Sequence, residues 1–211
     1  MIRLAIIGAG DLALQIEDHA LQNEFKIIGF FDDYKKKGDE FGTVIILGGL
    51  QDVYKNFQNG LFSHVIIAIG YKHLIFKEKL SEQLKQVGIP FISVISKNSI
   101  INPSANIKPG CFILPGCIID KNVQIGVNSI LNCGCILSHD SIIKKNSFLG
   151  PGVILAGFAS IGEACFIGMG SKIIDSVLID NNIRTGAGTL VIKNLVKKGL
   201  YLGTPAKWIK E

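Results

Sequence analysis

Of the four histidines in the chain, only His139 lies in the second half, within the segment LNCGCILSHDSIIKKN (131–146). Asp140 follows it directly. An imidazole can accept a proton near neutral pH, and a carboxylate beside it can hold one ring nitrogen protonated so that the other acts as a base. A lone histidine is also often an ordinary surface or packing residue. The pair therefore predicts proton abstraction only if the fold brings a substrate to it.

A second group of residues could bind phosphate. The segment IIGAGDLA (6–13) places Gly8 and Gly10 in a pattern similar to G-x-G-x-x-G/A, with Ala13 in the third position. Backbone N–H groups at such a turn, and the helix that follows it, can hold phosphate oxygens. Asp32 and Asp33 end the next predicted strand, where a carboxylate can meet a ribose hydroxyl. The pattern is compatible with NAD, but about 90 residues fit half of a dinucleotide fold, sized for one nucleotide, better.

The elements that position these glycines alternate between strand and helix. The hydrophobic pattern predicts helices at 11–22 and 72–87 and strands at 2–8, 26–31, 63–70 and 89–95. Alternation of this kind is typical of a parallel sheet with helical crossovers. We therefore expect an α/β domain, a Rossmann-like half, over residues 1–94.

From residue 95 the hydrophobic pattern changes to a period of six. Aliphatic residues recur at every sixth position, namely Ile95, Ile101, Ile107, Ile113, Ile119, Ile125, Leu131, Leu137, Ile143, Leu149, Leu155, Ile161, Ile167, Ile173 and Ile179. The next position, Thr185, breaks the rule. A mostly small residue follows four positions later in each repeat. A fixed hexapeptide period predicts a parallel β-helix over residues 95–194, followed by a C-terminal tail, 195–211.

The repeats resemble those of the hexapeptide-repeat acyltransferases, whose β-helix is left-handed and has three repeats in each coil of eighteen residues. Gly157 lies eighteen residues after His139 and should stack over it, which would leave room for a substrate and expose a backbone N–H. An ordinary turn glycine is the alternative. The same phase points Cys111, Cys117, Cys135 and Cys165 inward as structural fillers and puts Cys133 at an outer corner.

Composition narrows the functional classes. Hydrophobic residues make up 48% and charged residues 18% of the 211 residues, which favours a well-packed protein over a disordered one. The net charge of +5 is scattered, which disfavours nucleic acid as a partner but suits small phosphorylated ligands. No apolar run is long enough for a membrane span, and no secretory signal is recognised. With five cysteines, we expect a cytoplasmic protein with reduced thiols.

A metal site at His139 is the rival interpretation. Zinc would need about three converging ligands, and the gamma-class carbonic anhydrases, which share this repeat, use several histidines. The repeat region has one, so we predict no metal.

The two halves together resemble the nucleotide-sugar acetyltransferases of the bacillosamine, perosamine and sialic-acid pathways. The matching segments are GAGDLA (8–13), GFFDD (29–33), AIG (68–70), SHDSII (138–143), GPGVILAG (150–157), TGAG (185–188) and GTPAK (203–207). The resemblance implies a homotrimer, a cleft for a nucleotide-linked amino sugar formed with the N-terminal domain, and acetyl-coenzyme A between neighbouring β-helices.

The resemblance also implies roles for individual residues. His139, Asp140 and Gly157 would be catalytic. The nucleotide-sugar site would contain Gly8, Gly10, Asp11, Leu12, Asp32, Asp33 and Gly70. The acetyl-coenzyme A site would contain Phe148, Gly157, Gly168 and Ala187. Some members carry a second histidine where this chain has Phe148, a side chain that can pack against pantetheine but cannot donate a hydrogen bond. Of the other histidines, His73 could touch the nucleotide sugar, and His19 is expected on a helix surface.

We therefore expect an acetyl-coenzyme A-dependent N-acetyltransferase acting on an amino group of a nucleotide-linked deoxysugar, with direct attack assisted by His139. O-acetylation of a sialic-acid-type sugar is the nearest alternative. An NAD-dependent oxidoreductase and a non-catalytic trimeric scaffold are alternatives from other classes.

Overall fold

The computed structural model describes residues 1–211. Its contacts divide the chain into an N-terminal unit, Met1–Ile95, and a repeat unit, Ser96–Glu211. None of its helices combines the length and the apolar character that a transmembrane helix requires.

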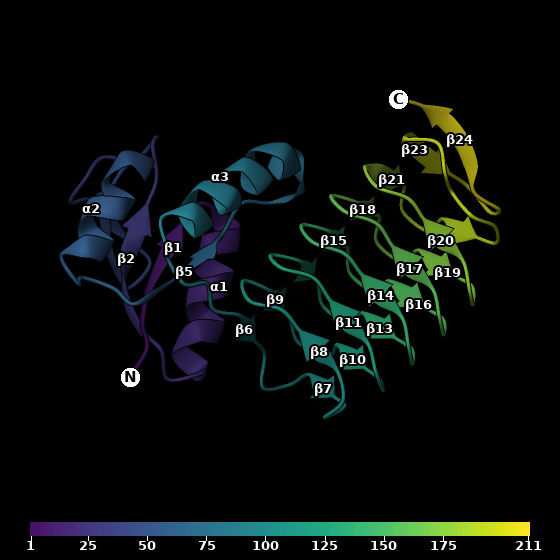
Figure 1. Ribbon diagram of the computed structural model, residues 1–211, viewed down its shortest axis with the longest axis horizontal. Helices are drawn as coiled ribbons and strands as arrows, with labels where there is room; N and C mark the ends of the chain where they lie inside the picture. The colour runs from purple at the N-terminus through teal and green to yellow at the C-terminus, as the bar shows by residue number, and fades with distance from the viewer. The chain divides into compact units, whose positions relative to one another are not determined.

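The N-terminal unit is built on a five-stranded sheet with the order β3-β4-β2-β1-β5 (Figure 1). Strands β4, β2, β1 and β5 are parallel, and β3 pairs antiparallel with β4. The elements are β1 (Arg3–Ile7), α1 (Asp11–Gln22), β2 (Lys26–Phe31), β3 (Glu40–Phe41), β4 (Val44–Gly48), η1 (Leu50–Asp52), α2 (Val53–Gln58), β5 (His64–Ile67), η2 (Tyr71–His73), α3 (Leu74–Gln86) and β6 (Val94–Ile95).

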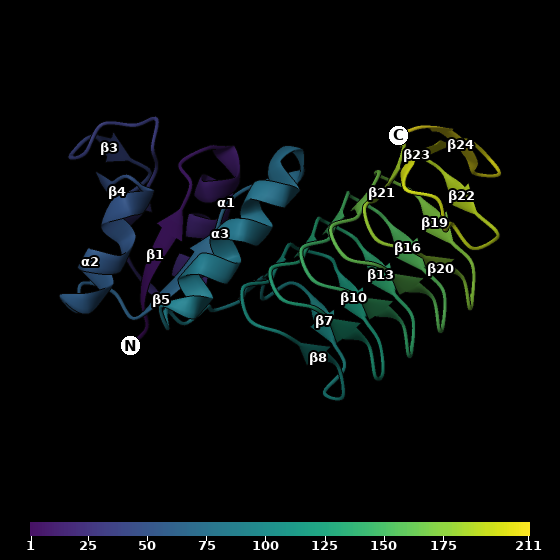
Figure 2. The ribbon, with the colours of Figure 1, turned by 45° about the horizontal axis from the view of Figure 1, so that its top comes forward.

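Alternate residues of the strands face opposite sides of this sheet. Ala5 and Ile7 share one buried cluster with Val53 of α2 and with Leu80 and Leu84 of α3, so α2 and α3 cover one face. Strand residues alternate in direction, so the buried Leu4 and Ile6 face the other side, where α1 contacts β1 and β2. Figures 1 and 2 show these helices around the strands.

Most predicted elements of this unit are present, and two expectations are wrong. The segment predicted as a strand at 89–95 contains only β6, because Pro90 lacks an N–H for a ladder and the segment joins β5 through a single bridge at Phe91. His19, expected on a helix surface, is half-buried. The β3–β4 hairpin and α2 were not predicted.

The repeat unit is a parallel β-helix whose short strands form three faces. Face 1 contains β7 (Ile100–Ile101), β10 (Ile118–Ile119), β13 (Ile136–Leu137), β16 (Ile154–Leu155), β19 (Lys172–Ile173) and β22 (Leu190–Val191). Face 2 contains β8 (Asn106–Ile107), β11 (Gln124–Ile125), β14 (Ile142–Ile143), β17 (Ser160–Ile161) and β20 (Leu178–Ile179). Face 3 contains β9 (Phe112–Ile113), β12 (Ile130–Leu131), β15 (Phe148–Leu149), β18 (Phe166–Ile167), β21 (Ile183–Thr185), β23 (Gly199–Leu202) and β24 (Lys207–Lys210).

From β7 to β19 each strand pairs with the strand eighteen residues further along, as the sequence predicted; Ile118 pairs with Ile136, and Ile136 with Ile154. Successive coils stack on one another along the axis of the β-helix (Figure 2). The segment predicted as a tail contains β23 and β24, and β24 pairs antiparallel with β23.

The interior explains the small residue of each repeat. From Cys111 onward these side chains are buried. Several serines and cysteines at this position donate a hydrogen bond to the backbone carbonyl fifteen residues further along, namely Ser99, Cys111, Cys117, Ser129, Cys135, Ser147, Cys165 and Ser171. Thr185, the exception in the aliphatic series, accepts from the Gly168 N–H at 3.0 Å and lies 3.1 Å from the Ser171 hydroxyl. Thus its polar atom is satisfied inside the coil.

The backbone turns at each edge of the prism through a residue with positive φ. Every sixth residue from Gly110 to Gly188 has φ between 52° and 80°. We name the edges by the faces they join. Edge 1–2 includes the turn with His139, because it connects β13 to β14, and edge 3–1 connects strands such as β15 and β16.

Candidate active site

His139 and Asp140 form a hydrogen-bonded pair on edge 1–2. The Nδ1 atom of His139 lies 3.0 Å from Oδ2 of Asp140, and the His139 side chain is about half exposed, at 51%. Asp140 occupies the left-handed turn position, with φ of 58°, which a short polar side chain tolerates. The pair is therefore held by the turn itself and faces solvent, where a substrate can reach it.

Gly157 lies directly against the imidazole, one coil further along. A Cβ atom built on Gly157 would lie 2.7 Å from Cε1 and 2.8 Å from Nε2 of His139, so any side chain here would displace the imidazole. The N–H of Gly157 donates to no acceptor within the chain. Because Gly157 has no side chain, the His139 ring can occupy this position. The Gly157 N–H remains available as a hydrogen-bond donor next to Nε2.

Two neighbours of this pair were not identified from the sequence. Phe158, 61% exposed, places its ring edge to face with the imidazole at a centroid distance of 5.2 Å. On the other side, Asn122 Nδ2 donates to Asp140 Oδ1 at 3.0 Å. Both residues lie eighteen positions from Asp140, so the length of one coil could have predicted that they are its neighbours.

The negative charge of the Asp140 carboxylate would support His139 as a base. The hydrogen bond from Asn122, followed by that from His139, lowers the pKa of the Asp140 carboxyl below its ordinary value. An ionised carboxylate can only accept, so it favours the tautomer with the proton on Nδ1. Nε2 then presents a lone pair beside Gly157, which is the geometry of a general base next to an oxyanion donor.

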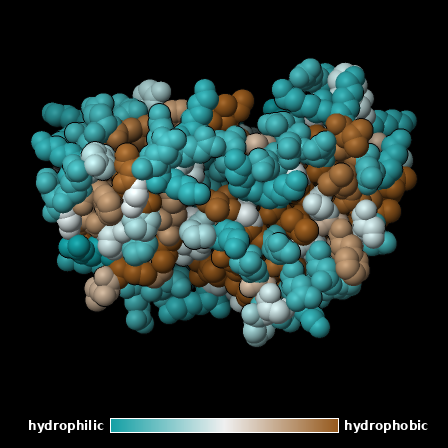
Figure 3. All heavy atoms as spheres, viewed as in Figure 1, coloured by the Kyte–Doolittle hydropathy of each residue, from teal (hydrophilic) through white to brown (hydrophobic).

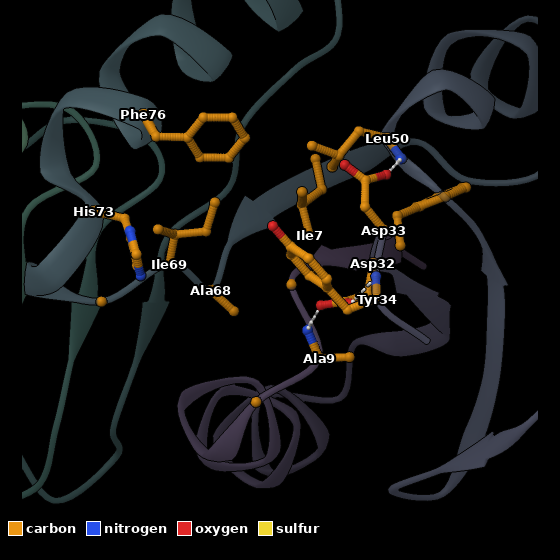
Figure 4. Close-up of a pocket in the computed structure, with 14 residues that line it drawn as sticks. Ile7, Ala9, Asp32, Asp33, Tyr34, Leu50, Ala68, Ile69, His73 and Phe76 are labelled. Carbon is orange, nitrogen blue, oxygen red and sulfur yellow. Dashed lines mark hydrogen bonds between the residues drawn. The ribbon is translucent and has the colours of Figure 1, made fainter. Parts of the chain in front are cut away.

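The N-terminal unit contains a separate pocket of about 510 Å³ at the carboxyl ends of its parallel strands (Figure 4). This is where open α/β sheets bind ligands, and the volume suits a small molecule. Five residues predicted for nucleotide-sugar binding line it, namely Gly8, Gly10, Asp32, Asp33 and Gly70. Asp11 and Leu12, also predicted, lie in the first turn of α1 and do not line it.

The two predicted glycines serve different purposes. Gly8 has φ of +104°, and a Cβ there would lie 2.9 Å from the Ala68 carbonyl oxygen, so the fold itself requires glycine. Gly10 has extended backbone geometry, and no atom lies within 4 Å of the place that a Cβ would take. The space beside Gly10 is therefore open to a ligand at the start of α1.

The acidic pair is partly engaged with the backbone. Asp32 accepts the N–H groups of Ala9 at 2.8 Å and Tyr34 at 2.9 Å, and Asp33 accepts that of Leu50 at 2.7 Å. Asp32 therefore anchors the glycine turn. His73, together with Phe76, which the sequence did not identify, lines the opposite wall of the pocket (Figure 4).

The remaining residues predicted for acetyl-coenzyme A lie away from His139. Gly168 and the exposed Ala187 lie in turns of edge 3–1, and Phe148 lies on face 3, stacked on Phe166 at a centroid distance of 5.7 Å. A Cβ at Gly168 would meet the Gly186 backbone at 2.5 Å, so this glycine is also required by the coil. One β-helix does not bring these residues to Gly157, because face 1 separates the two edges.

Comparisons with known proteins find similarities to the N-terminal unit and to the whole chain. Residues 3–84 match the family model of the PglD N-terminal domain. The N-terminal unit is therefore similar to the PglD N-terminal domain over most of its length. No curated protein sequence matches the chain.

Solved structures resemble the whole chain. A histidine-to-alanine variant of GDP-perosamine N-acetyltransferase from Caulobacter crescentus, in complex with CoA and GDP-perosamine, has a TM-score of 0.91 and 25% identity, over 99% of this chain and 97% of that one. PerB from Caulobacter crescentus, in complex with the same two ligands, has a TM-score of 0.90 and 26% identity, over 98% and 96%. The acetyltransferase domain of PglB from Neisseria gonorrhoeae, with acetyl coenzyme A, has a TM-score of 0.89 and 22% identity, over 98% of each chain.

These similarities confirm the family resemblance and the fold class predicted from the sequence, an α/β domain followed by a left-handed parallel β-helix. The roles of the individual site residues rest on the distances and contacts described above.

Proposed function

We propose that the protein is an acetyl-coenzyme A-dependent N-acetyltransferase that acts on an amino group of a nucleotide-linked deoxysugar. The observation that carries the proposal is the hydrogen-bonded His139–Asp140 pair packed against Gly157, whose N–H donates to no acceptor within the chain. The similarity to perosamine N-acetyltransferases that bind CoA and GDP-perosamine supports the two substrate classes.

The proposed reaction is a direct transfer. The sugar amine attacks the thioester carbonyl while Nε2 of His139 takes a proton from the nitrogen. The Gly157 N–H stabilises the oxyanion of the tetrahedral intermediate. The C–S bond then breaks, and the proton passes to the departing CoA thiolate. Asp140 holds the other ring nitrogen and stabilises the imidazolium that forms.

The nucleotide sugar is assigned to the pocket of the N-terminal unit. Its diphosphate would approach the open backbone at Gly10 and the start of α1, where N–H groups point outward. Asp33 has one carboxylate oxygen beyond the bond to Leu50 with which to meet a ribose hydroxyl. Asp11 and Leu12 contribute through the first turn of α1 and not through the pocket wall.

Acetyl-coenzyme A is assigned to a site shared between two copies of the chain. Gly157 is on edge 1–2, whereas Gly168 and Ala187 are on edge 3–1, so a cofactor that touches all three must lie between neighbouring β-helices. Face 1, which separates these edges, presents outward aliphatic side chains, namely Ile100, Ile118, Ile136 and Ile154. Ile100 is 68% exposed. Figure 3 shows that hydrophobic residues also lie among hydrophilic ones on the surface in that view. Three copies packed through such faces would give three equivalent sites, a homotrimer.

The reduced cysteines inside the coils fit a cytoplasmic location.

The test is release of the CoA thiol from acetyl-coenzyme A against UDP-, dTDP- and GDP-linked amino sugars, with sialic acid as an O-acetylation substrate. We expect turnover with at least one amino sugar. Turnover with sialic acid alone would favour the O-acetyltransferase alternative. Thermal stabilisation by NAD without any acetyl transfer would contradict the proposal.

Light scattering should give a trimer of the 22.8 kDa chain. A fully active monomer would contradict the shared site.

A further inference from the structure

Both carboxylate oxygens of Asp140 are held by side chains. Oδ2 lies 3.0 Å from His139 Nδ1, and Oδ1 accepts from Asn122 Nδ2 at 3.0 Å. Asn122 lies eighteen residues earlier, at the same left-handed position of edge 1–2 one coil away. We propose that Asn122 is a positioning residue for acetyl transfer, which fixes the Asp140 carboxylate so that its second oxygen holds His139. The inference rests on the proposed function of His139.

A second anchor is needed because of the chemistry of the carboxylate. The terminal torsion of an aspartate side chain is broad, so a single hydrogen bond leaves the carboxylate plane free to turn. The side chain of Asp140 is also about one-third exposed, and water can compete for its oxygens. The amide of Asn122 removes this freedom from one oxygen and thereby aims the other at Nδ1.

Asn122 is itself fixed by the coils below it. Its N–H donates to Ser104 Oγ at 2.9 Å, and Ser104 Oγ donates to Asn102 Oδ1 at 2.9 Å. The hydrogen bonds thus run along edge 1–2 from Ser104 through Asn122 to Asp140 and His139. A donor amide beside the carboxylate also favours its charged form, in agreement with the lowered pKa of Asp140, to which Lys121 adds.

A purely structural role is the competing explanation, because asparagine suits the left-handed conformation. Asn182 has nearly the same φ, 58° against 59°, but lies on edge 2–3, away from the edge that holds His139. Asn122→Gly keeps the turn and deletes the amide, and Asn182→Gly is the matched control.

We expect Asn122→Gly to lower kcat about ten-fold, as for loss of a hydrogen bond to a charged group. The KM values of both substrates should stay within about two-fold, because the effect passes through the base. The control should keep wild-type kcat. In an Asp140→Gly background, which keeps the left-handed turn and removes the acceptor, Asn122→Gly should cause no further loss, since its target is gone. A wild-type kcat in Asn122→Gly, or an equal loss in both backgrounds, would overturn the proposal.

A readout without turnover separates this inference from the proposed reaction. Nitrogen NMR of the His139 ring, at a pH where the ring is neutral, should show the proton on Nδ1 in the wild type and a shift toward Nε2–H in Asn122→Gly. An unchanged tautomer would overturn the positioning role even if acetyl transfer is confirmed. If no sugar is acetylated, the proposed function fails, and the tautomer still decides whether Asn122 positions the pair.

Discussion

Two edges of the β-helix use the same backbone turn in different ways. On edge 3–1 every left-handed position from the second coil onward is glycine, namely Gly116, Gly134, Gly152, Gly170 and Gly188. On edge 1–2 the equivalent residues are Asn122, Asp140, Phe158 and Ser176. The φ values of the two sets are similar, so the difference is not one of geometry.

The difference shows where the chain accepts backbone strain. A side chain in the left-handed region costs about 1–2 kcal/mol, which glycine avoids. Asparagine and aspartate are the best tolerated exceptions, whereas a phenylalanine there is an outlier. Asp140 is part of the His139 pair, Phe158 contacts His139, and Asn122 donates a hydrogen bond to Asp140. On edge 1–2, three of the four strained positions thus belong to the His139–Asp140 pair or its neighbours. Edge 2–3 also has non-glycine residues at these positions, namely Asn128, Asn146, Ala164 and Asn182.

Among the variants that keep the His139–Asp140 pair, the largest effect is expected at Gly157, which lies against the proposed base His139. Gly157→Val should lower kcat by about 10²-fold, because its Cβ would displace the imidazole and the base would be lost. Gly157 does not have positive φ, so the melting temperature should stay near that of the wild type. Steady-state kinetics with a circular dichroism melt would check both. Wild-type kcat in a folded variant would show that the ring does not need its present position.

The two glycines of the N-terminal pocket should separate binding from folding. Gly10→Val has room in the fold and should weaken nucleotide-sugar binding by about ten-fold or more, while acetyl-coenzyme A binding is spared. Gly8→Val should instead destabilise the protein, because of its positive φ and the Ala68 carbonyl. Calorimetric titration with each ligand measures the first effect. Equal loss of both ligands in Gly10→Val would contradict the separation of the two sites.

Phe158→Gly tests the strain on edge 1–2 directly. Relief of the left-handed cost should outweigh the entropy of glycine and stabilise the protein by about 0.5 kcal/mol. The edge contact with His139 is lost, so kcat should fall about three-fold. Gly134→Ala, on edge 3–1, should destabilise by about 1 kcal/mol and leave kcat unchanged. Denaturant unfolding measures the change in the free energy of unfolding of each variant, and so shows whether it is stabilised or destabilised. A destabilised Phe158→Gly would show that the phenylalanine is held for stability and not for the site.

The smallest effect concerns the cysteines. Burial raises the pKa of Cys165 to about 11, and its thiol should therefore not react at neutral pH. Only Cys133 is exposed, so brief alkylation should label that residue alone and leave kcat unchanged. Because the thiol form is favoured in the folded state, the Cys165 contribution to stability is present below pH 9 and is lost as the pH rises toward 11. Labelling of the four inward cysteines in native protein would contradict the assigned coil phase.

The sequence predicted the parts that depend on period. The six-residue repeat placed the inward aliphatic and small residues correctly, and the coil length of eighteen placed Gly157 against His139. The same arithmetic pointed to Asn122 and Phe158, which went unrecognised because neither residue type suggests catalysis by itself.

Other features could not be derived from local pattern. The hairpin β3–β4 and the six-residue α2 are too short to show a period. The bond from Ala9 to Asp32 depends on how two segments 23 residues apart in the sequence meet in space. The placement of Gly168 and Ala187 on a different edge from His139, by contrast, follows from the eighteen-residue period, although the motifs alone do not show it.

The general-base role of His139 is the central claim, and kcat of His139→Ala at saturating substrates tests it most directly. We predict a loss of at least about 10²-fold, with the binding of both substrates nearly intact, because a base acts mainly in the transition state. A folded His139→Ala protein that keeps more than about a tenth of wild-type kcat would contradict the account.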